Sequence, residues 1–231
     1  MVTIILFMIL IILVYQLGKI YELEQFDNNT GLSIIEKINL LKCMLVFHEL
    51  SINHNLWYNI AFGTLLGAVR HRGFIPWDDD IDLLVFHHQM DTLTAVLDIM
   101  TKQFGYKIEY TWKLIRIYAD DKHFIDLFPV SIADGKVLRC QIDDKNKCQQ
   151  IDQSWWTSWF GFPDTYLSID NKKMYQFDGL NLYGTQNATE LLSFWYGSDF
   201  LTTCKTHYLT NHDTYVEPKT IKCENLPKPQ L

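Results

Sequence analysis

The 231-residue sequence has no excess of basic charge. It holds 20 Lys and Arg against 27 Asp and Glu, which gives a net charge of −7. Proteins that bind nucleic acid through its phosphates usually present a basic face, so this balance argues against a general nucleic-acid binder. A few basic residues placed in one pocket are still enough to hold a small phosphorylated ligand.

Cysteine is scarce, and its spacing is not that of a metal site. The five cysteines are Cys43, Cys140, Cys148, Cys204 and Cys223. Cys140 and Cys148 are close enough in the chain to close a small loop in an oxidising compartment, and the odd number leaves at least one thiol free. Internal repeats are also absent. Hydrophobic residues make up 48% of the chain, which is ample for a packed core.

Charge is missing from the beginning of the chain. Residues 2–17 (VTIILFMILIILVYQL) carry no charged side chain and show no polar face. This length is at the short end for a helix that crosses a bilayer. We expect residues 1–18 to be a retained transmembrane signal anchor, followed by a polar linker over residues 19–31. A cleaved signal peptide is the main alternative, although basic residues before the run and a good cleavage site are lacking; a buried core helix is the other.

The sequence carries little information about the orientation of the chain in the membrane. Lys19 is almost the only flanking charge that the positive-inside rule can use. Two glycosylation sequons begin at Asn28 (NNT) and Asn187 (NAT) and favour a single-pass protein whose body faces the ER or Golgi lumen in a eukaryotic host. Each has a structural alternative. Asn28 can simply belong to the linker, and Asn187 can cap a helix, with Glu190 completing a capping box.

The rest of the chain alternates between helix and strand patterns. Apolar residues that recur every three or four positions predict helices over residues 65–70, 89–104 and 189–196, and a long first helix that opens at Thr30 or Ser33 and runs to about residue 53. Short apolar or aromatic runs predict strands over residues 56–62, 81–86, 106–118 (a strand or a hairpin), 124–130 and 177–183 (a pair). Residues 133–153 are polar and predict a surface insertion, and residues 218–231 predict a loose tail. We therefore expect one mixed α/β (α+β) domain over residues 32–217.

Acidic residues gather where the strand over residues 81–86 begins. Four carboxylates lie within five residues, and Asp80 and Asp82 flank Ile81. In a strand these two side chains project to the same side, whereas Asp79 falls on the other. Two like charges this close are unfavourable unless a cation lies between them. Carboxylate oxygens are ligands that Mg²⁺ and Mn²⁺ prefer, so the pattern predicts a metal site.

Two further features belong with this cluster. Asp126 lies alone in the apolar run FIDLFPV, where an unpaired carboxylate is costly. If its strand lies beside residues 81–86, Asp126 completes a three-carboxylate metal site. The pair Gly63-Thr64 ends an apolar run and precedes a predicted helix, so its backbone N–H groups are placed to hold a phosphate.

Taken together, these residues resemble the motifs of one family. GTLLGAVRHRGFIPWDDDID, residues 63–82, closely resembles the signature of the LicD/fukutin family. IDLFP around Asp126 resembles its third motif, and FDG followed by LLSFWYGSDF resembles its C-terminal part. The resemblance implies a nucleotidyltransferase fold, shared with polymerase β-like enzymes. It also implies transfer of a phosphorylated alcohol, such as phosphocholine or ribitol phosphate, from a CDP-activated donor to a glycan hydroxyl.

The resemblance further implies roles for single residues. It makes Asp80, Asp82 and Asp126 the catalytic metal ligands, Gly63 and Thr64 the phosphate-binding turn, and Asp78 a supporting acid. The implied cofactor is Mg²⁺ or Mn²⁺. The implied partners are a CDP-alcohol donor, a glycan acceptor and the membrane reached by the N-terminal helix, with no nucleic acid.

Basic residues near the motifs are candidates to neutralise donor phosphates. Arg70 and Arg116 are the first candidates, and Arg72 and Lys113 follow. Trp77 either stacks on a ligand or packs the loop, and packing is the simpler expectation. Because no motif residue is missing, we expect an enzyme. The alternative is a catalytically silent member that binds a glycan or a partner enzyme and keeps the acids as a structural metal site.

Overall fold

A computed structural model of the chain describes residues 32–111, 114–142, 148–150, 159–167, 172–205, 209–210, 214–215 and 220–225. The helices in these residues are α2 (Ile34–Asn53), α3 (Phe62–Arg70), α4 (Met90–Phe104) and α5 (Ala188–Tyr196). Short 3-10 turns lie at His87–Gln89, Asp164–Tyr166 and Cys223–Asn225. The described parts form the mixed α/β domain that the sequence predicts.

One mixed sheet organises the domain. Its strands are β1 (Tyr58–Ile60), β2 (Ile81–Phe86), β3 (Lys107–Tyr110), β4 (Ile115–Tyr118), β5 (Phe124–Ala133), β6 (Lys136–Ile142), β7 (Cys148–Gln150) and β8 (Phe162–Pro163). The order along the sheet is β1-β2-β5-β4-β3, and β6 continues from β5 to pair with β7 and β8. Strands β2 and β5 are parallel, and the other pairings are antiparallel.

The remaining described strands form three short antiparallel pairs. These are β9 (Lys172–Phe177) with β10 (Leu180–Thr185), β11 (Thr203–Lys205) with β14 (Thr220–Lys222), and β12 (Leu209–Thr210) with β13 (Thr214–Tyr215). The β9–β10 hairpin packs beside β1. The pairing of β3 with β4 agrees with the hairpin alternative for residues 106–118. The strand pair predicted over residues 177–183 is present, but it is longer and begins at Lys172.

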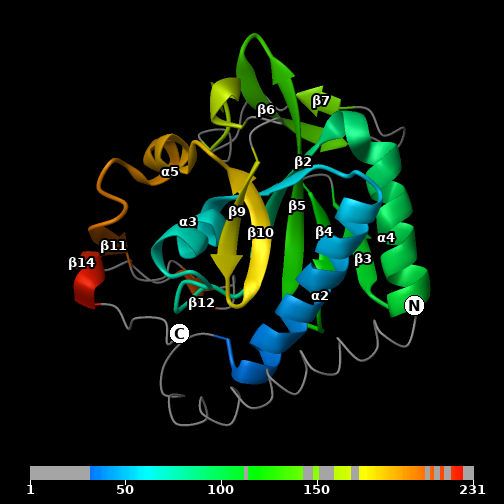
Figure 1. Cartoon of the computed structure of the whole chain (residues 1–231), viewed down its shortest axis with the longest axis horizontal. Helices are drawn as coiled ribbons and strands as arrows, with labels where there is room; N and C mark the ends of the chain where they lie inside the picture. The colour runs from blue at the N-terminus through cyan, green and yellow to red at the C-terminus, as the bar shows by residue number, and fades with distance from the viewer. Residues whose placement is uncertain are drawn as a thin grey trace.

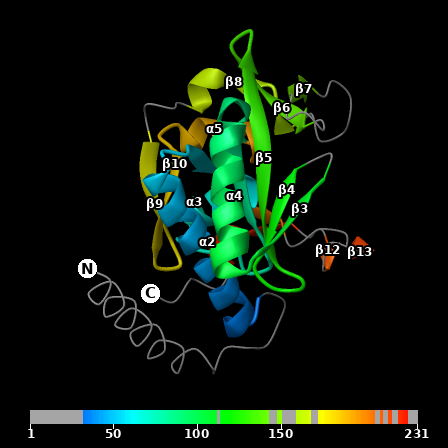
Figure 2. The same cartoon turned by 90° about the vertical axis from the view of Figure 1, so that its right-hand side faces the viewer.

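Helices cover the sheet on both sides. Helices α2 and α4 pack against each other on one side, and Figure 2 shows them lying together in front of the strands. Helix α3 packs on β2 and on α5, and Figure 1 shows α3 and α5 on the opposite side from α2 and α4. Because both faces of β2 and β5 are covered, these strands are almost uniformly apolar, as buried parallel strands usually are.

Helices α2 and α5 differ in how their first turns are capped. Ser33 caps α2 in a full capping box, in which its Oγ accepts from the N–H of Glu36 and its own N–H donates to the Glu36 carboxylate. At α5 the capping box predicted for Asn187 is not formed. The Asn187 Nδ2 instead donates to the carbonyl oxygen of Thr165 at 2.6 Å.

The polar segment after β5 is not a surface insertion, contrary to expectation. Strand β6 pairs with the last four residues of β5, and Val137 and Cys140 are fully buried. Residues 134–135 form the connecting two-residue turn, with φ of 50° at Asp134 and 70° at Gly135. The pairing partner, rather than an apolar run, makes this segment a strand. Residues 143–147 and 151–153 lie outside the described residues.

The C-terminal segment is tied back to the domain where it is described. Residues 220–225 lie in the stretch expected to be loose, yet β14 pairs with β11 and Cys223 forms a disulfide with Cys204. The predicted disulfide Cys140–Cys148 is confirmed. Cys43 is the free cysteine, and it is fully buried.

None of the helices within the described residues is long and apolar enough to cross a membrane. The predicted anchor over residues 1–18 and the linker over residues 19–31 lie outside the described part of the chain.

Candidate active site

The parallel pairing of β2 with β5 brings two of the predicted acids side by side. Asp82 on β2 is the register partner of Asp126 on β5. Asp80 stands two residues before Asp82, at the point where the chain enters β2. Asp126 and Asp80 are 5% and 9% exposed, so both carboxylates are largely removed from water. The structure therefore gathers the three predicted acids at one end of β2 and β5.

The environment of Asp82 disfavours its negative charge. Burial and the neighbouring charges of Asp80, Asp78 and Asp126 raise the pKa of Asp82 well above its usual value of 3.8. A hydrogen bond from the backbone N–H of Gly63 opposes this rise. A cluster of this kind is stabilised by a proton, by cationic side chains or by a bound cation.

The beginning of α3 faces this cluster. Phe62, the first residue of α3, has a φ of 42°, which is unusual for a bulky residue and turns the chain sharply from β1 into the helix. Ring contacts hold it there, the closest being Trp195 at 4.5 Å between centroids. The helix thus begins three residues before the predicted residue 65, so Gly63 and Thr64 lie in its first turn rather than in a break.

Thr64 holds the strand that carries the acids. Its Oγ1 accepts a hydrogen bond from the N–H of Asp82 at 2.8 Å, and the side chain is 1% exposed. The N–H of Ala61 donates to the carbonyl oxygen of Asp82 at 3.0 Å. The hydroxyl of Thr64 is therefore used to fix the position of Asp82, while the N–H of Gly63 faces its carboxylate.

Asp78 lies directly against Gly63. A Cβ atom on Gly63 would come within 2.6 Å of the Asp78 Oδ2, which is closer than a real Cβ contact. The glycine is thus required for the close approach of this carboxylate to the helix start. Trp77 is partly buried and packs on the hydrophobic core, which agrees with the expectation that it packs the loop.

Arg116 is bound to Asp126 rather than free to meet a ligand. On β4 it is the register partner of Asp126, and its Nε and Nη2 donate to Oδ1 and Oδ2 at 2.8 and 2.9 Å. The guanidinium also lies over the Phe124 ring, 3.5 Å from its centroid. Burial lowers the pKa of Arg116, but the hydrogen bonds and charge of Asp126 outweigh it and raise this pKa further above neutrality.

Arg70 reaches the same region from the end of α3. Its Nε donates to the Nε2 of His71 at 3.0 Å, and its Nη1 donates to the carbonyl oxygen of Phe200 at 3.3 Å. Burial lowers the pKa of Arg70, and the charges of Tyr196 and Asp78 oppose this. Burial and Arg70 together lower the pKa of His71 to about 4, so His71 is neutral and accepts this hydrogen bond. Arg72 is exposed, and Lys113 lies outside the described residues.

The donor atoms available here fit a hard divalent cation. They are carboxylate oxygens whose mutual repulsion a cation would relieve. Among the described residues, however, the group whose ligand atoms lie within 4.8 Å of one another is a different one, namely His87, Cys140 and Cys148. The two cysteines of that group are joined in a disulfide, so it is not a metal site. At the aspartates, both oxygens of Asp126 face Arg116.

Tyr196 is a residue of this site that the sequence analysis did not single out. Burial and the charges of Asp82 and Asp78 raise the pKa of Tyr196 well above its usual value, while Arg70 opposes the rise. It is the last residue of α5, which packs on α3. The motif LLSFWYGSDF contains it, but the motif does not tell which of its aromatic residues faces the acids.

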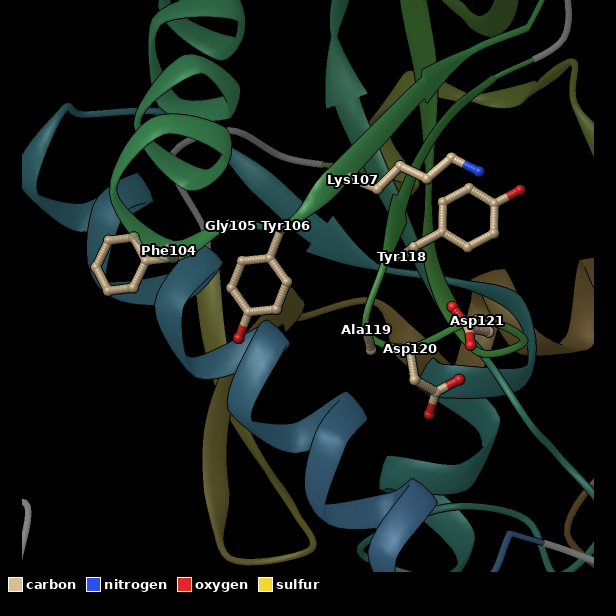
Figure 3. A pocket seen from close by; sticks show the side chains of 8 residues that line it. All are labelled: Phe104, Gly105, Tyr106, Lys107, Tyr118, Ala119, Asp120 and Asp121. Carbon is tan, nitrogen blue, oxygen red and sulfur yellow. The ribbon is translucent and has the colours of Figure 1, made fainter.

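A separate hollow lies at the β3 edge of the sheet, where β3 begins and β4 ends. Figure 3 shows it between the end of α4 and the strands β3 and β4, with Lys107 alongside the ring of Tyr118 and Tyr106 facing from the opposite wall. Its volume is about 370 Å³. The Lys107 Nζ lies 4.4 Å from the centroid of the Tyr118 ring. The aspartates at Asp78, Asp80, Asp82 and Asp126 do not line it.

Comparison with known proteins relates the chain to a protein family. A family model described as "LicD/FKTN/FKRP, nucleotidyltransferase domain" matches residues 55–187. The uncharacterized protein RP689 of Rickettsia prowazekii (strain Madrid E) is 42% identical over 151 residues, which cover 64% of this chain and 50% of that protein. The lipopolysaccharide cholinephosphotransferase LicD of Haemophilus influenzae is 46% identical over 61 residues, which cover 26% of this chain and 23% of that protein.

These matches span half or less of the length of the relatives. Among solved structures, the lincomycin-bound lincosamide antibiotic adenylyltransferase LnuA is 12% identical with a TM-score of 0.42, over 75% of this chain and 98% of that one. The family model covers Gly63 in the first turn of α3, the acids Asp80 and Asp82, and Asp126. Because it matches more than half of the 231 residues, the chain belongs to the LicD/FKTN/FKRP family, and residues 55–187 are its nucleotidyltransferase domain.

Proposed function

We propose that the protein transfers a phosphorylated alcohol, such as phosphocholine or ribitol phosphate, from a CDP-activated donor to a glycan hydroxyl, with Mg²⁺ or Mn²⁺ as cofactor. The observation that carries this proposal is the register pairing of Asp82 with Asp126, with Asp80 two residues away and the start of α3 facing them. The named activity of the H. influenzae relative supports a transferase of this class.

The chain's own residues suit the binding of a diphosphate. The first turn of α3 offers backbone N–H groups at a helix N-terminus, where negative charge is favoured. Arg70 already lies within electrostatic reach of Asp78 and Tyr196, so its charge is available beside the cluster. Asp80, Asp82 and Asp126 would hold the divalent cation, which supplies neutralisation of the diphosphate charge when bound.

The reaction is an in-line displacement at the distal phosphorus of the donor. The glycan hydroxyl oxygen forms a bond to that phosphorus, the bond from phosphorus to the bridging oxygen breaks, and CMP leaves with the bond's electrons. We assign the hydroxyl proton to Asp126, because it is the acid on the strand next to Asp82. Both oxygens of Asp126 accept hydrogen bonds from Arg116 in the structure, so this role requires one of these two bonds to open.

The test measures CMP release from a panel of CDP-alcohols with a glycan acceptor, in Mg²⁺ or Mn²⁺. We expect release with at least one donor and a loss of about 10² to 10³ or more in rate for Asp82→Asn and Asp126→Asn. Asp79→Asn is the matched control, since it changes a neighbouring acid outside the proposed ligand set. Full activity in Asp82→Asn would overturn the assignment.

The rival function is a catalytically silent member of the family that binds a glycan or a partner enzyme. Absence of CMP release with every donor, together with glycan binding that survives Asp82→Asn, would favour the rival. We also propose that the protein is attached to a membrane by residues 1–18 with its body in a lumenal compartment. The two disulfides support an oxidising environment.

A further inference from the structure

The turn between β9 and β10 has an unusual neighbour. The turn is Asp178-Gly179, with φ of 43° and 87°, which suits the two-residue hairpin that joins Phe177 to Leu180. In Figure 1 it lies at the lower end of the hairpin, on the side of the molecule where α2 begins. This turn would be sufficient to close the hairpin, yet Asp178 makes contacts well beyond it.

Asp178 contacts the loop that follows α3 with both its backbone and its side chain. Its backbone N–H donates to the carbonyl oxygen of Arg72 at 2.8 Å. Its Oδ2 accepts a hydrogen bond from the backbone N–H of Phe74 at 2.9 Å, and Lys37 of α2 lies 3.4 Å from the same oxygen. The side chain therefore joins the loop, the hairpin and the first turn of α2 at one point.

The fit at this point is close. A Cβ atom on Gly73 would lie 2.5 Å from the Asp178 carboxylate, so glycine is needed between Arg72 and Phe74. The ring of Phe74 contacts that of Phe177, with centroids 4.7 Å apart. Arg72 is itself held at a φ of 58°. The loop thus has a defined conformation, which the Asp178 carboxylate helps to fix.

The same loop carries the acids of the active site. After Phe74 it continues through buried Ile75, whose carbonyl oxygen accepts from the N–H of Asp78 at 2.9 Å. Asp78 then lies against Gly63, and Asp80 follows at the entrance to β2. A shift at Phe74 therefore moves the acids relative to the start of α3.

We propose that Asp178 is a positioning residue of the active site, which sets the direction of residues 72–80 and so the placement of Asp78 and Asp80. It does not touch the reacting atoms; it acts through Phe74 and the turn from Ile75 to Asp78. The catalytic part of this inference rests on the proposed transferase function. The structural part, that Asp178 holds the loop, does not.

Three variants separate the carboxylate from the turn. Asp178→Gly keeps a residue that tolerates positive φ but removes the acceptor. Asp178→Asn keeps an acceptor oxygen and tolerates this backbone conformation, but loses the charge that Lys37 faces. Asp134→Gly is the matched control, because Asp134-Gly135 forms a second Asp-Gly turn with positive φ at both residues, in the β5–β6 hairpin away from the loop.

Hydrogen exchange of the full-length protein is the readout that does not depend on activity. We expect the amide of Phe74 and its neighbours in residues 72–80 to exchange about tenfold faster or more in Asp178→Gly, because a hydrogen bond to a charged group is lost. Asp178→Asn should recover much of the protection, and Asp134→Gly should leave it unchanged. Unaltered exchange in Asp178→Gly, or an equal increase in Asp134→Gly, overturns the proposal.

CMP release then tests the consequence for catalysis. We expect kcat to fall about tenfold in Asp178→Gly with a smaller change in the KM for the acceptor, and to return largely in Asp178→Asn. Normal kcat in a variant whose loop exchanges faster would overturn the catalytic role. If the wild-type protein releases no CMP from any donor, the proposed function has failed, and the exchange rates still decide whether Asp178 holds the loop. If Asp178→Gly does not fold, Asp178→Asn and Lys37→Met provide the comparison through the same amide.

Discussion

Arg116 donates two parallel hydrogen bonds to the carboxylate of Asp126, from Nε to Oδ1 at 2.8 Å and from Nη2 to Oδ2 at 2.9 Å. The carboxylate is 7% exposed and the guanidinium side chain 27%. This two-point geometry fixes Asp126 in direction as well as in charge. It also explains how an acid can stand in the middle of an apolar strand, which would otherwise be a costly place for it.

Removal of Arg116 should destabilise the fold. In Arg116→Gln the buried carboxylate of Asp126 loses its charged partner, and we expect the free energy of unfolding to fall by about 3 kcal/mol. Arg116→Lys should recover only part of the lost free energy, because a lysine ammonium cannot donate two parallel hydrogen bonds to the Asp126 carboxylate as the guanidinium does. Urea unfolding measures the difference. The double variant Arg116→Gln/Asp126→Asn should be more stable than Arg116→Gln alone; equal stability would show that the pair is not coupled.

Asp82→Asn should stabilise the protein near neutral pH, whereas it should abolish the proposed transfer. The pKa of Asp82 is raised on folding, so the folded state binds its proton more tightly than the unfolded state does. The wild-type protein therefore loses stability as the pH rises above the usual value of 3.8, and the asparagine variant does not. Thermal unfolding in metal-free buffer should show a higher Tm for Asp82→Asn at about pH 7 and little difference at acid pH. A lower Tm for the variant at neutral pH would contradict this.

Gly63→Ala should be destabilised because its Cβ meets the Asp78 carboxylate. A contact at 2.6 Å forces one of the two to move, and overpacking of this kind costs about 1–3 kcal/mol. The cost should largely disappear in Asp78→Ala/Gly63→Ala. Gly67→Ala is the control, since its Cβ would meet the backbone oxygen of Gly73 at 2.4 Å, where trimming Asp78 gives no relief. A double-mutant cycle by urea unfolding measures this coupling, and strict additivity would refute it.

The number of thiols that react with a thiol reagent should show directly whether the two disulfides are formed. With Cys140–Cys148 and Cys204–Cys223 closed, a thiol reagent should find one group, Cys43, and only after denaturation, because this thiol is buried. Cys223→Ser should lower the free energy of unfolding by about 2–4 kcal/mol. It should also loosen Arg70, whose Nη1 lies 3.7 Å from the Cys223 sulfur. More than one reactive thiol in the denatured, unreduced protein would argue against the proposed lumenal location.

The membrane anchor proposed for residues 1–18 should remain on the mature protein. Residues 1–18 lack both a polar face and a good cleavage site. We expect the chain to stay in the membrane fraction after carbonate extraction and to keep its original N-terminus. In a eukaryotic host, glycosidase treatment should increase the gel mobility if Asn28 or Asn187 carries a glycan. A soluble product that begins beyond residue 18 would contradict retention.

Sequence patterns predicted the elements whose own residues carry the signal. The run IDLLVF and the run FIDLFPV are apolar enough to be buried strands whatever they pair with. Strand β6 was not predicted from the sequence, because its strand conformation depends on its pairing with β5. Its sequence KVLRCQI mixes charged and apolar residues, and the pairing with β5 decides its conformation.

The acids of the site could be found because carboxylates in apolar strands are conspicuous, but their partners could not. Arg116 was expected at a phosphate, and its contact with Asp126 depends on the register of β4 on β5, which no local pattern specifies. Cys204 and Cys223, and likewise Asp178 and Phe74, meet through long-range packing. A single sequence holds no signal for such distant pairs.

The parallel register of β2 and β5 also bears on how the protein folds. Strands β2 and β5 are neighbours in the sheet, but α4, β3 and β4 separate them along the chain, and parallel pairing across such a long connection is slow to form. The step that completes the sheet is also the step that brings two carboxylates together, so the repulsion between them opposes this closure. Refolding should therefore be fastest in conditions that mask these charges, at acid pH or at high ionic strength.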